Sequence, residues 1–342
     1  MSTATRVGIT RDILDSRGEP AFGRKALALL DGAQNVEWEY LPDVVPAITP
    51  DHAARYDALN VNIARVPAAA VTRSDCRLRV VARHGVGYDS VDIPAMTAAG
   101  ILVTHTPHPM PRPVATIALT FILALAGKLM EKDRMTRSGR WNERMDHMGM
   151  GLTGRTLGVV GAGRIGKELI RMARTFGLEL LATDPNVDAV ELGYAGARKV
   201  DLSTLLAASD FVVVCCLLDA QTRHLIGAAQ LAQMKESAYF INVARGPIVD
   251  ETALIAALAQ GRIAGAALDV FETEPVANDN PLLAMDNVIV TPHSLCWTDE
   301  CFHNMASTGL SSIVDVLARR APPFIVNREV LAHPRVREWL AP

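Results

Sequence analysis

The chain has 342 residues, of which 49% are hydrophobic and 21% charged, and its formal net charge is -3. This composition is that of a globular protein, long enough for two domains, and it excludes a disordered or fibrous chain. No excess of basic residues suggests a nucleic-acid partner. No apolar region follows the N-terminus as in a secretory signal, and the longest apolar stretch, 114–127, is shorter than the ~20 residues that a membrane span needs. We therefore expect a cytoplasmic protein without a membrane segment.

The five cysteines agree with a reducing compartment, because they form neither a CxxC pair nor the spacing of a disulfide framework. Cys296, Cys301 and His303 could supply three metal ligands, but no fourth ligand is evident. We predict no metal site.

Short β-rich runs alternate with helical stretches in the first third of the chain. Alternation of this kind predicts a parallel sheet and an α/β domain. The expected strands are 7–10, 58–61, 78–81 and 101–103, and the expected helices include 24–30 and 93–99.

A second α/β unit follows, and its strands predict a doubly wound sheet. The expected strands are 157–160, 178–183, 211–216, 238–243, 264–270 and 288–291, with a helix at 165–176. The tail at 298–319 reads as one long helix that packs back on the N-terminal domain. We therefore predict two Rossmann-like doubly wound α/β domains, with 105–296 as a nucleotide-binding domain inserted into a substrate domain of 1–104 and 297–342.

A glycine-rich segment, Gly161-Ala162-Gly163-Arg164-Ile165-Gly166, follows the strand at 157–160 and opens a helix. Its three glycines suit a tight turn, backbone approach to a pyrophosphate and close packing of helix on strand. Asp184 ends the next strand, 21 residues beyond Gly163 (184 − 163), where an acid binds the adenosine ribose. The alternative is that Asp184 is a turn residue before Pro185. No Arg or Lys follows within 185–197, so the pattern favours NAD over NADP.

Three later segments bring an arginine, a carboxylate and a histidine to strand ends. Arg245 can bind a substrate carboxylate and polarise a carbonyl. His293 can deliver a proton near neutral pH, and Glu274 can stabilise the imidazolium and fix the tautomer of the ring. The alternatives are an Arg245 that caps a turn, a structural histidine and a solvated loop acid, and Glu272 is a rival for the role of Glu274.

Two further motifs, 83–89 (Arg-His-Gly-Val-Gly-Tyr-Asp) and 152–158 (Leu-Thr-Gly-Arg-Thr-Leu-Gly), complete a resemblance that covers nearly the whole chain. The chain resembles the D-isomer-specific 2-hydroxyacid dehydrogenase family. The resemblance implies an NAD-dependent oxidoreductase that acts on a small 2-hydroxy or 2-oxo acid and forms a homodimer through the nucleotide domain. It implies catalytic roles for Arg245, Glu274 and His293, and substrate binding by the backbone N–H groups of Val86 and Gly87. The implied cofactor contacts are Gly161, Gly163, Arg164, Ile165, Gly166, Asp184, Cys216, Leu217, Thr222, Val243, Ala244, Arg245, Asp269 and His293, with Asp269 on the nicotinamide amide.

Departures from the family pattern leave the substrate open. Asn62-Ile63-Ala64-Arg65 stands where relatives often have Arg-Ser-x-Thr, Thr116 replaces a common glutamate, and Leu217 replaces a common proline. Trp297 brings bulk close to His293 in sequence and is a candidate wall of the substrate site.

The nearest alternatives within the family are glyoxylate or hydroxypyruvate reductases and phosphoglycerate dehydrogenase-like enzymes, and Asn62 weakens the case for a phosphorylated substrate. A formate dehydrogenase would have glutamine in place of Glu274. An NAD-sensing binding protein of the corepressor type is the alternative from another class.

Overall fold

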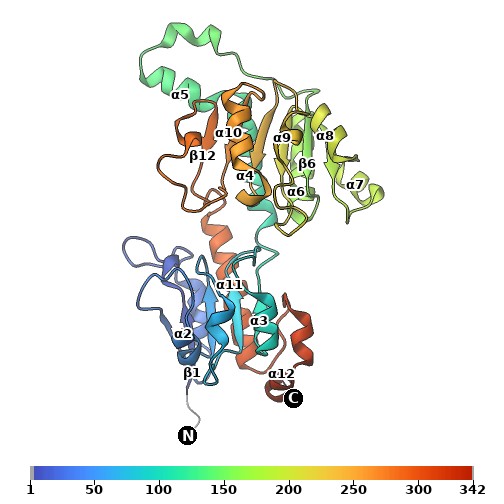
Figure 1. Ribbon diagram of the computed structural model, residues 1–342. Coiled ribbons are helices and arrows are strands. Elements are labelled where there is room, and N and C mark those ends of the chain that lie inside the picture. Colours follow the sequence, from blue (N-terminus) through green and yellow to red (C-terminus); the bar gives the residue numbers. More distant parts are fainter. Residues whose placement is uncertain (1–3, 341–342) are drawn as a thin grey trace. The chain divides into compact units, whose positions relative to one another are not determined.

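The computed structural model describes residues 4–340 and divides into two compact units, 1–110 with 297–342 and 111–296 (Figure 1). The chain leaves the first unit at Met110 rather than after residue 104. The reason is that the segment after the last strand of the first sheet is hydrogen-bonded to that unit: Thr106 N–H donates to Gly85 O at 2.9 Å. Both units contain a parallel sheet flanked by helices, so the predicted α/β class and the inserted second unit are confirmed.

The first unit contains a five-stranded parallel sheet in the order β2-β1-β3-β4-β5. From β1 the chain adds β2 on one side, and it then adds β3, β4 and β5 on the other side, so the switch point lies between β1 and β3. A switch point of this kind opens a crevice at the carboxyl ends of the strands. The edge strand β2 was not predicted, and its side chains are exposed or only partly buried. The strands are β1 (Thr5–Ile9), β2 (Val36–Tyr40), β3 (Ala58–Val61), β4 (Val80–Arg83) and β5 (Leu102–Thr104).

Helices cover both faces of this sheet, because alternate residues of its central strands are apolar on each side. On one face α11 (Asp299–Leu317) packs against Val80 and Ala82 of β4, together with α1 (Ala28–Asp31) and α12 (Pro334–Leu340). On the other face α2 (Pro50–Arg55) and α3 (Ile93–Ala98) pack near Val81. The prediction that the tail helix packs on the N-terminal domain is confirmed.

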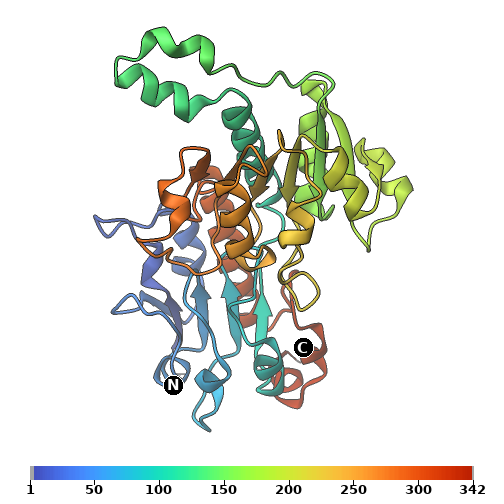
Figure 2. The same cartoon turned by 45° about the horizontal axis from the view of Figure 1, so that its top comes forward.

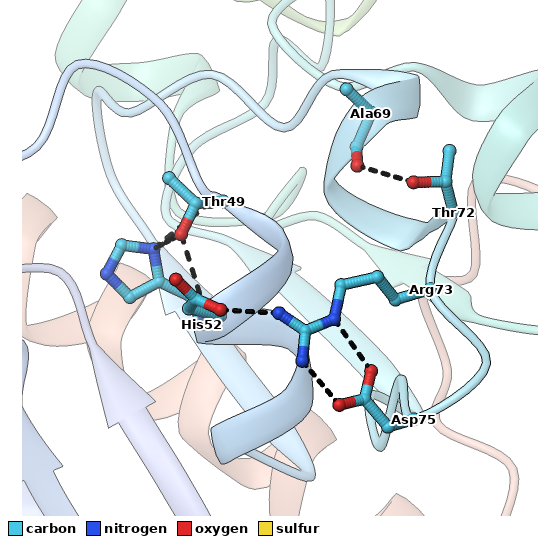
Figure 3. A network of polar contacts seen from close by, with 7 residues as sticks. Thr49, His52, Ala69, Thr72, Arg73 and Asp75 are labelled. Atoms are coloured by element: carbon cyan, nitrogen blue, oxygen red, sulfur yellow. Dashed lines mark hydrogen bonds and ion pairs between the residues drawn. The ribbon is translucent and has the colours of Figure 1, made fainter.

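Helix α2 was also missed in the sequence, although its start carries a clear signal. Thr49 caps the helix: its hydroxyl accepts from His52 N–H at 3.5 Å, and its own N–H donates to His52 Nδ1 at 3.1 Å. Arg73, in the loop that precedes β4, donates to Asp51 of this helix. It also donates to Asp75 of its own loop (Figure 3). These ion pairs are exposed to solvent, which screens them, so they contribute little to stability.

The second unit contains a seven-stranded parallel sheet in the order β12-β11-β10-β9-β6-β7-β8. The chain runs from β6 outward to β8 and then from β9 outward to β12, so the switch point lies between β6 and β9. Only the two-residue edge strand β8 was not predicted. The strands are β6 (Thr156–Val160), β7 (Glu179–Thr183), β8 (Arg198–Lys199), β9 (Phe211–Val214), β10 (Tyr239–Asn242), β11 (Gly265–Leu268) and β12 (Val288–Val290).

Helix α4 (Pro111–Ala126) is largely buried in the second unit, where it contacts α6 (Arg164–Ala173), β10 and β11. The core on the other face includes residues of α8 (Leu202–Ala208), α9 (Ala228–Leu231) and α10 (Glu251–Ala259), whereas α7 (Ala189–Ala195) contacts α6 and β8. Among residues 4–340, no single helix is long and apolar enough to cross a membrane; only α4 and α5 (Leu129–Arg137) together reach that length, and they are bent by 56°.

An arm extends from the second unit after α4. The chain does not continue from α4 into α5 as one helix, because Lys128 adopts a left-handed conformation at the start of α5. In Figures 1 and 2, α5 and the short helix at Trp141–Asp146 reach away from the seven-stranded sheet.

Candidate active site

The three glycines of the fingerprint have three different environments. Gly161 has φ +92°, and a Cβ there would lie 2.5 Å from the backbone N of Cys216. A side chain at this position would therefore force the turn away from Cys216. A Cβ at Gly166 would lie 2.2 Å from Gly161 O, which explains the close approach of α6 to the turn. Gly163 faces open space, with no atom within 4 Å of its Cβ position. The glycines therefore fit a turn that brings the backbone against a pyrophosphate, where the N-terminus of α6 binds anions.

Asp184 lies directly after β7 and is fixed against this turn. One carboxylate oxygen accepts from Ala162 N–H and the other from Asn186 N–H, each at 2.8 Å. An open hollow of about 530 Å³ adjoins Asp184. The hollow is lined by Thr183, Asp184, Pro185, Lys199, Val200, Asp201 and Leu202. Lys199 is a cation just beyond residues 185–197, the range without Arg or Lys. Its ammonium group donates to Val187 O at 2.5 Å.

The other expected cofactor residues lie at neighbouring strand ends of the same sheet. Arg164 and Ile165 begin α6, while Val243 and Ala244 follow β10. Cys216 follows β9, and burial raises the pKa of its thiol to about 11, so the thiol is neutral. The loop that contains Leu217 is stabilised by Thr222, whose hydroxyl donates to Leu217 O at 2.6 Å.

Arg245, Glu274 and His293 follow β10, β11 and β12, three adjacent strands. Because carboxyl ends of parallel strands share one edge of a sheet, the three loops lie together. The Arg245 loop is fixed by Asn242, whose amide donates to Arg245 O at 2.9 Å and accepts from Ala244 N–H at 3.0 Å. A Cβ at Gly246 would lie 1.8 Å from Phe271 O, so only glycine lets this loop meet the loop of Glu274.

Glu274 and His293 form a hydrogen bond, with Glu274 Oε2 2.7 Å from His293 Nδ1. The other carboxylate oxygen accepts from Phe271 N–H at 3.0 Å. Burial raises the pKa of Glu274, but the hydrogen bond and charge of His293 outweigh it, with help from Phe271 N–H and Arg245, and lower that pKa below its usual range. Glu274 is therefore an acceptor, and the shared proton resides on Nδ1.

The rival carboxylate, Glu272, lies in another network. Its Oε1 is 2.6 Å from His224 Nε2 and 3.6 Å from Arg223 Nη2. Its backbone N–H donates to the Glu251 carboxylate at 2.9 Å. The geometry therefore pairs His293 with Glu274 and leaves Glu272 to join its loop to the start of α10.

Asp269 has a structural contact that the sequence did not indicate. It is 3% exposed, and its Oδ1 accepts from the Thr291 hydroxyl at 2.5 Å and from the N–H groups of Ser294 and Leu295 at 3.2 Å. These bonds stabilise the loop on both sides of His293, whose own φ is +52°. Thr291 was not among the expected site residues, since a threonine at a strand end carries no distinctive signal.

The expected substrate residues Val86, Gly87 and Trp297 all belong to the first unit. Val86 and Gly87 follow β4, and Trp297 precedes α11 with its ring centroid 4.9 Å from that of Phe302. Phe302 in turn packs on His84, at 5.1 Å. Burial, with a contribution from Arg83, lowers the pKa of His84 to about 3, so this ring is a neutral packing element beside the loop.

Residues 4–340 contain no group of three or more His, Cys, Asp and Glu side chains placed to hold a metal ion. The Sγ of Cys301 lies 3.6 Å from Met110 Sδ, in the core of the first unit.

Comparisons with known proteins show the family to which the chain belongs. A family model described as D-isomer specific 2-hydroxyacid dehydrogenase, NAD binding domain, matches residues 119–294. The chain is 39% identical over 266 residues to a glyoxylate reductase of Korarchaeum cryptofilum, covering 77% of this chain and 80% of the relative. It is 37% identical over 297 residues to a glyoxylate/hydroxypyruvate reductase B of Citrobacter koseri, covering 85% and 91%.

A solved structure of a glyoxylate reductase from Paecilomyes thermophila superposes with a TM-score of 0.80 at 26% identity, covering 95% of this chain and 99% of that chain. These relatives are reductases, and they support an enzyme rather than an NAD-sensing binding protein. The chain therefore belongs to the D-isomer specific 2-hydroxyacid dehydrogenase family, as an NAD-dependent oxidoreductase that transfers hydride between the nicotinamide and a small 2-hydroxy or 2-oxo acid.

Proposed function

We propose that the protein reduces a small 2-oxo acid to the D-2-hydroxy acid with His293 as the proton donor. The observation that carries this proposal is the hydrogen bond of 2.7 Å between His293 Nδ1 and the ionised Glu274. NADH supplies the hydride when bound, and Gly161, Gly163 and Gly166 form the turn that holds it. Asp269, which accepts hydrogen bonds from residues on both sides of His293, is assigned to the nicotinamide amide.

The Glu274 carboxylate stabilises the positive charge of the doubly protonated ring. Because its Nδ1 proton is held by Glu274, the proton that His293 can transfer is the one on Nε2. This proton passes to the carbonyl oxygen as negative charge develops there. In the oxidative direction the same nitrogen accepts the proton of the hydroxyl group.

Arg245 is assigned two tasks, binding the substrate carboxylate and polarising the carbonyl group with its donor fork. Its loop is held rigidly by Asn242 and by the tight contact at Gly246. By the family resemblance, the backbone N–H groups of Val86 and Gly87 are assigned to binding of the substrate carboxylate, and Trp297 to the substrate side chain.

Glyoxylate and hydroxypyruvate are the proposed substrates, since the names of two relatives above refer to them. NADH oxidation should be followed with glyoxylate, hydroxypyruvate, pyruvate and 3-phosphohydroxypyruvate. We expect the first two to have the highest kcat/KM. No oxidation with any 2-oxo acid would reject the proposal, and a preference for the phosphorylated acid would reject the substrate choice.

We propose that Asp184 makes the enzyme prefer NAD(H) to NADP(H). Its carboxylate can accept from both ribose hydroxyls and would repel a 2′-phosphate. Asp184→Ala should therefore lower kcat/KM for NADH and narrow the preference for NADH over NADPH. The measurement is kcat/KM for each cofactor in both proteins. Equal use of the two cofactors by the wild type would contradict the assignment.

We also propose that the protein is cytoplasmic and forms a homodimer through the second unit. The arm exposes several large apolar side chains, and a surface of this kind is typical of a protein interface. Trp141 is 62% exposed, and the others are Leu129, Met130, Met145 and Met148. Trp141→Asp combined with Met145→Asp should convert the dimer to a monomer. Sedimentation velocity at micromolar concentration tests this, and a monomeric wild type would refute it.

A further inference from the structure

His105 contacts the loop to which substrate binding is assigned. It lies directly after β5, and its Nδ1 is 2.9 Å from the carbonyl oxygen of Val86. Its ring also meets the Tyr88 ring edge to face, with centroids 5.7 Å apart. The neighbouring Thr106 hydroxyl accepts from Gly85 N–H at 3.0 Å. The residues that follow β5 thus contact the 85–88 loop at Gly85, Val86 and Tyr88.

The bond to Val86 determines the orientation of one peptide group. A trans peptide is planar, and its C=O and N–H point in opposite directions. The Val86 carbonyl belongs to the same peptide as Gly87 N–H, so fixing the carbonyl on His105 turns this N–H away from the histidine. Within residues 4–340, neither Val86 N–H nor Gly87 N–H donates a hydrogen bond. Two backbone donors are therefore held ready on one short turn.

We propose that His105 is a positioning residue for substrate binding: its Nδ1–H fixes the Val86–Gly87 peptide so that the backbone donors of the loop can bind the substrate carboxylate. The inference rests on the proposed function, because it assigns this carboxylate to Val86 and Gly87. A carbonyl oxygen can only accept, so His105 carries a proton on Nδ1 when it makes this bond. The role requires a donor at the position of Nδ1 and does not require a charge.

Three substitutions at His105 distinguish the effect of the Nδ1–H donor from the effect of the aromatic ring. His105→Phe keeps an aromatic ring against Tyr88 and removes the donor. His105→Asn places an amide nitrogen near the position of Nδ1, whereas His105→Gln places it near Nε2. His108→Phe is the matched control, because it makes the same change three residues later, where the ring packs on Phe324 at 4.8 Å.

The experiment measures KM and kcat for the oxo acid, together with the Kd of NADH by fluorescence. His105→Phe should raise KM about five- to ten-fold, the effect of losing one hydrogen bond, with kcat within about two-fold and Kd unchanged. His105→Asn should restore KM to near the wild-type value, His105→Gln should not, and His108→Phe should match the wild type.

Two results would overturn the inference while leaving the proposed function intact. One is a His105→Phe enzyme with the wild-type KM. The other is a His105→Asn enzyme as impaired as His105→Phe, which would assign the effect to the ring rather than to the donor. A wild type that reduces no 2-oxo acid would instead reject the proposed function itself.

Discussion

Replacing His293 by asparagine is expected to lower kcat by ~10²–10⁴-fold, the usual contribution of a general acid, with NADH binding retained. Asparagine is a sharper test than alanine for two reasons. Its amide nitrogen can still donate to Glu274 in place of Nδ1, but nothing replaces Nε2, the atom that holds the transferable proton. Asparagine also tolerates the left-handed conformation, and His293 has φ +52°.

His224 offers a matched control for this substitution. It also has a positive φ, +53°, and its Nε2 is 2.6 Å from a glutamate, Glu272, in the same unit. Asparagine again tolerates the positive φ but does not replace Nε2, so His224→Asn loses the contact with Glu272 and disturbs its loop at least as much as His293→Asn does. The His224→Asn variant should still keep kcat within about three-fold. Stopped-flow measurement of NADH oxidation would compare the two variants. A His293→Asn enzyme as active as His224→Asn would remove His293 from the mechanism.

The cofactor turn and the candidate trio could be predicted because each feature is local in sequence. Gly161, Gly163 and Gly166 lie within six residues; a side chain at Gly161 or Gly166 would meet backbone atoms, whereas Gly163 faces open space. Arg245 and His293 follow apolar runs that identify strands, so their position at one edge of a sheet follows from parallel topology alone.

The contacts that position these residues were not predictable, because they join segments distant in sequence. Asp269 accepts from Thr291, Ser294 and Leu295, more than twenty positions away. The approach of Gly246 to Phe271 O depends on how two loops pack, and no residue type signals it. By contrast, the family resemblance already favours Glu274 over Glu272, because Glu274 directly precedes Pro275, and the contact of Glu274 with His293 Nδ1 agrees with that choice.

The helices and strands that the sequence did not predict are short or lie at sheet edges. Strand β2 pairs only with β1, and its alternation of apolar and charged residues over Val36–Tyr40 was a signal that could have been used. Strand β8 has two residues, Arg198 and Lys199, and carries no pattern. Lys199, on this strand, lines the same hollow as Asp184.

The second large effect is expected from Glu274→Gln and depends on pH. Glutamine keeps the size of the side chain and can still accept from Phe271 N–H, but it has no negative charge. The carboxylate favours the protonated ring of His293, so its loss makes that ring release its proton at lower pH. Reduction requires the protonated ring. The variant should therefore lose activity at neutral and higher pH and recover toward acid.

The pH profile of kcat/KM for the oxo acid, recorded for the wild type and Glu274→Gln, tests the Glu274–His293 pair most directly. Glu272→Gln is the control, because Glu272 pairs with His224 and not with His293. We expect the high-pH limb of the profile to move to lower pH in Glu274→Gln and to stay in place in Glu272→Gln. A Glu274→Gln profile that superimposes on the wild type, or a shift seen only in Glu272→Gln, would contradict the pairing on which the mechanism depends.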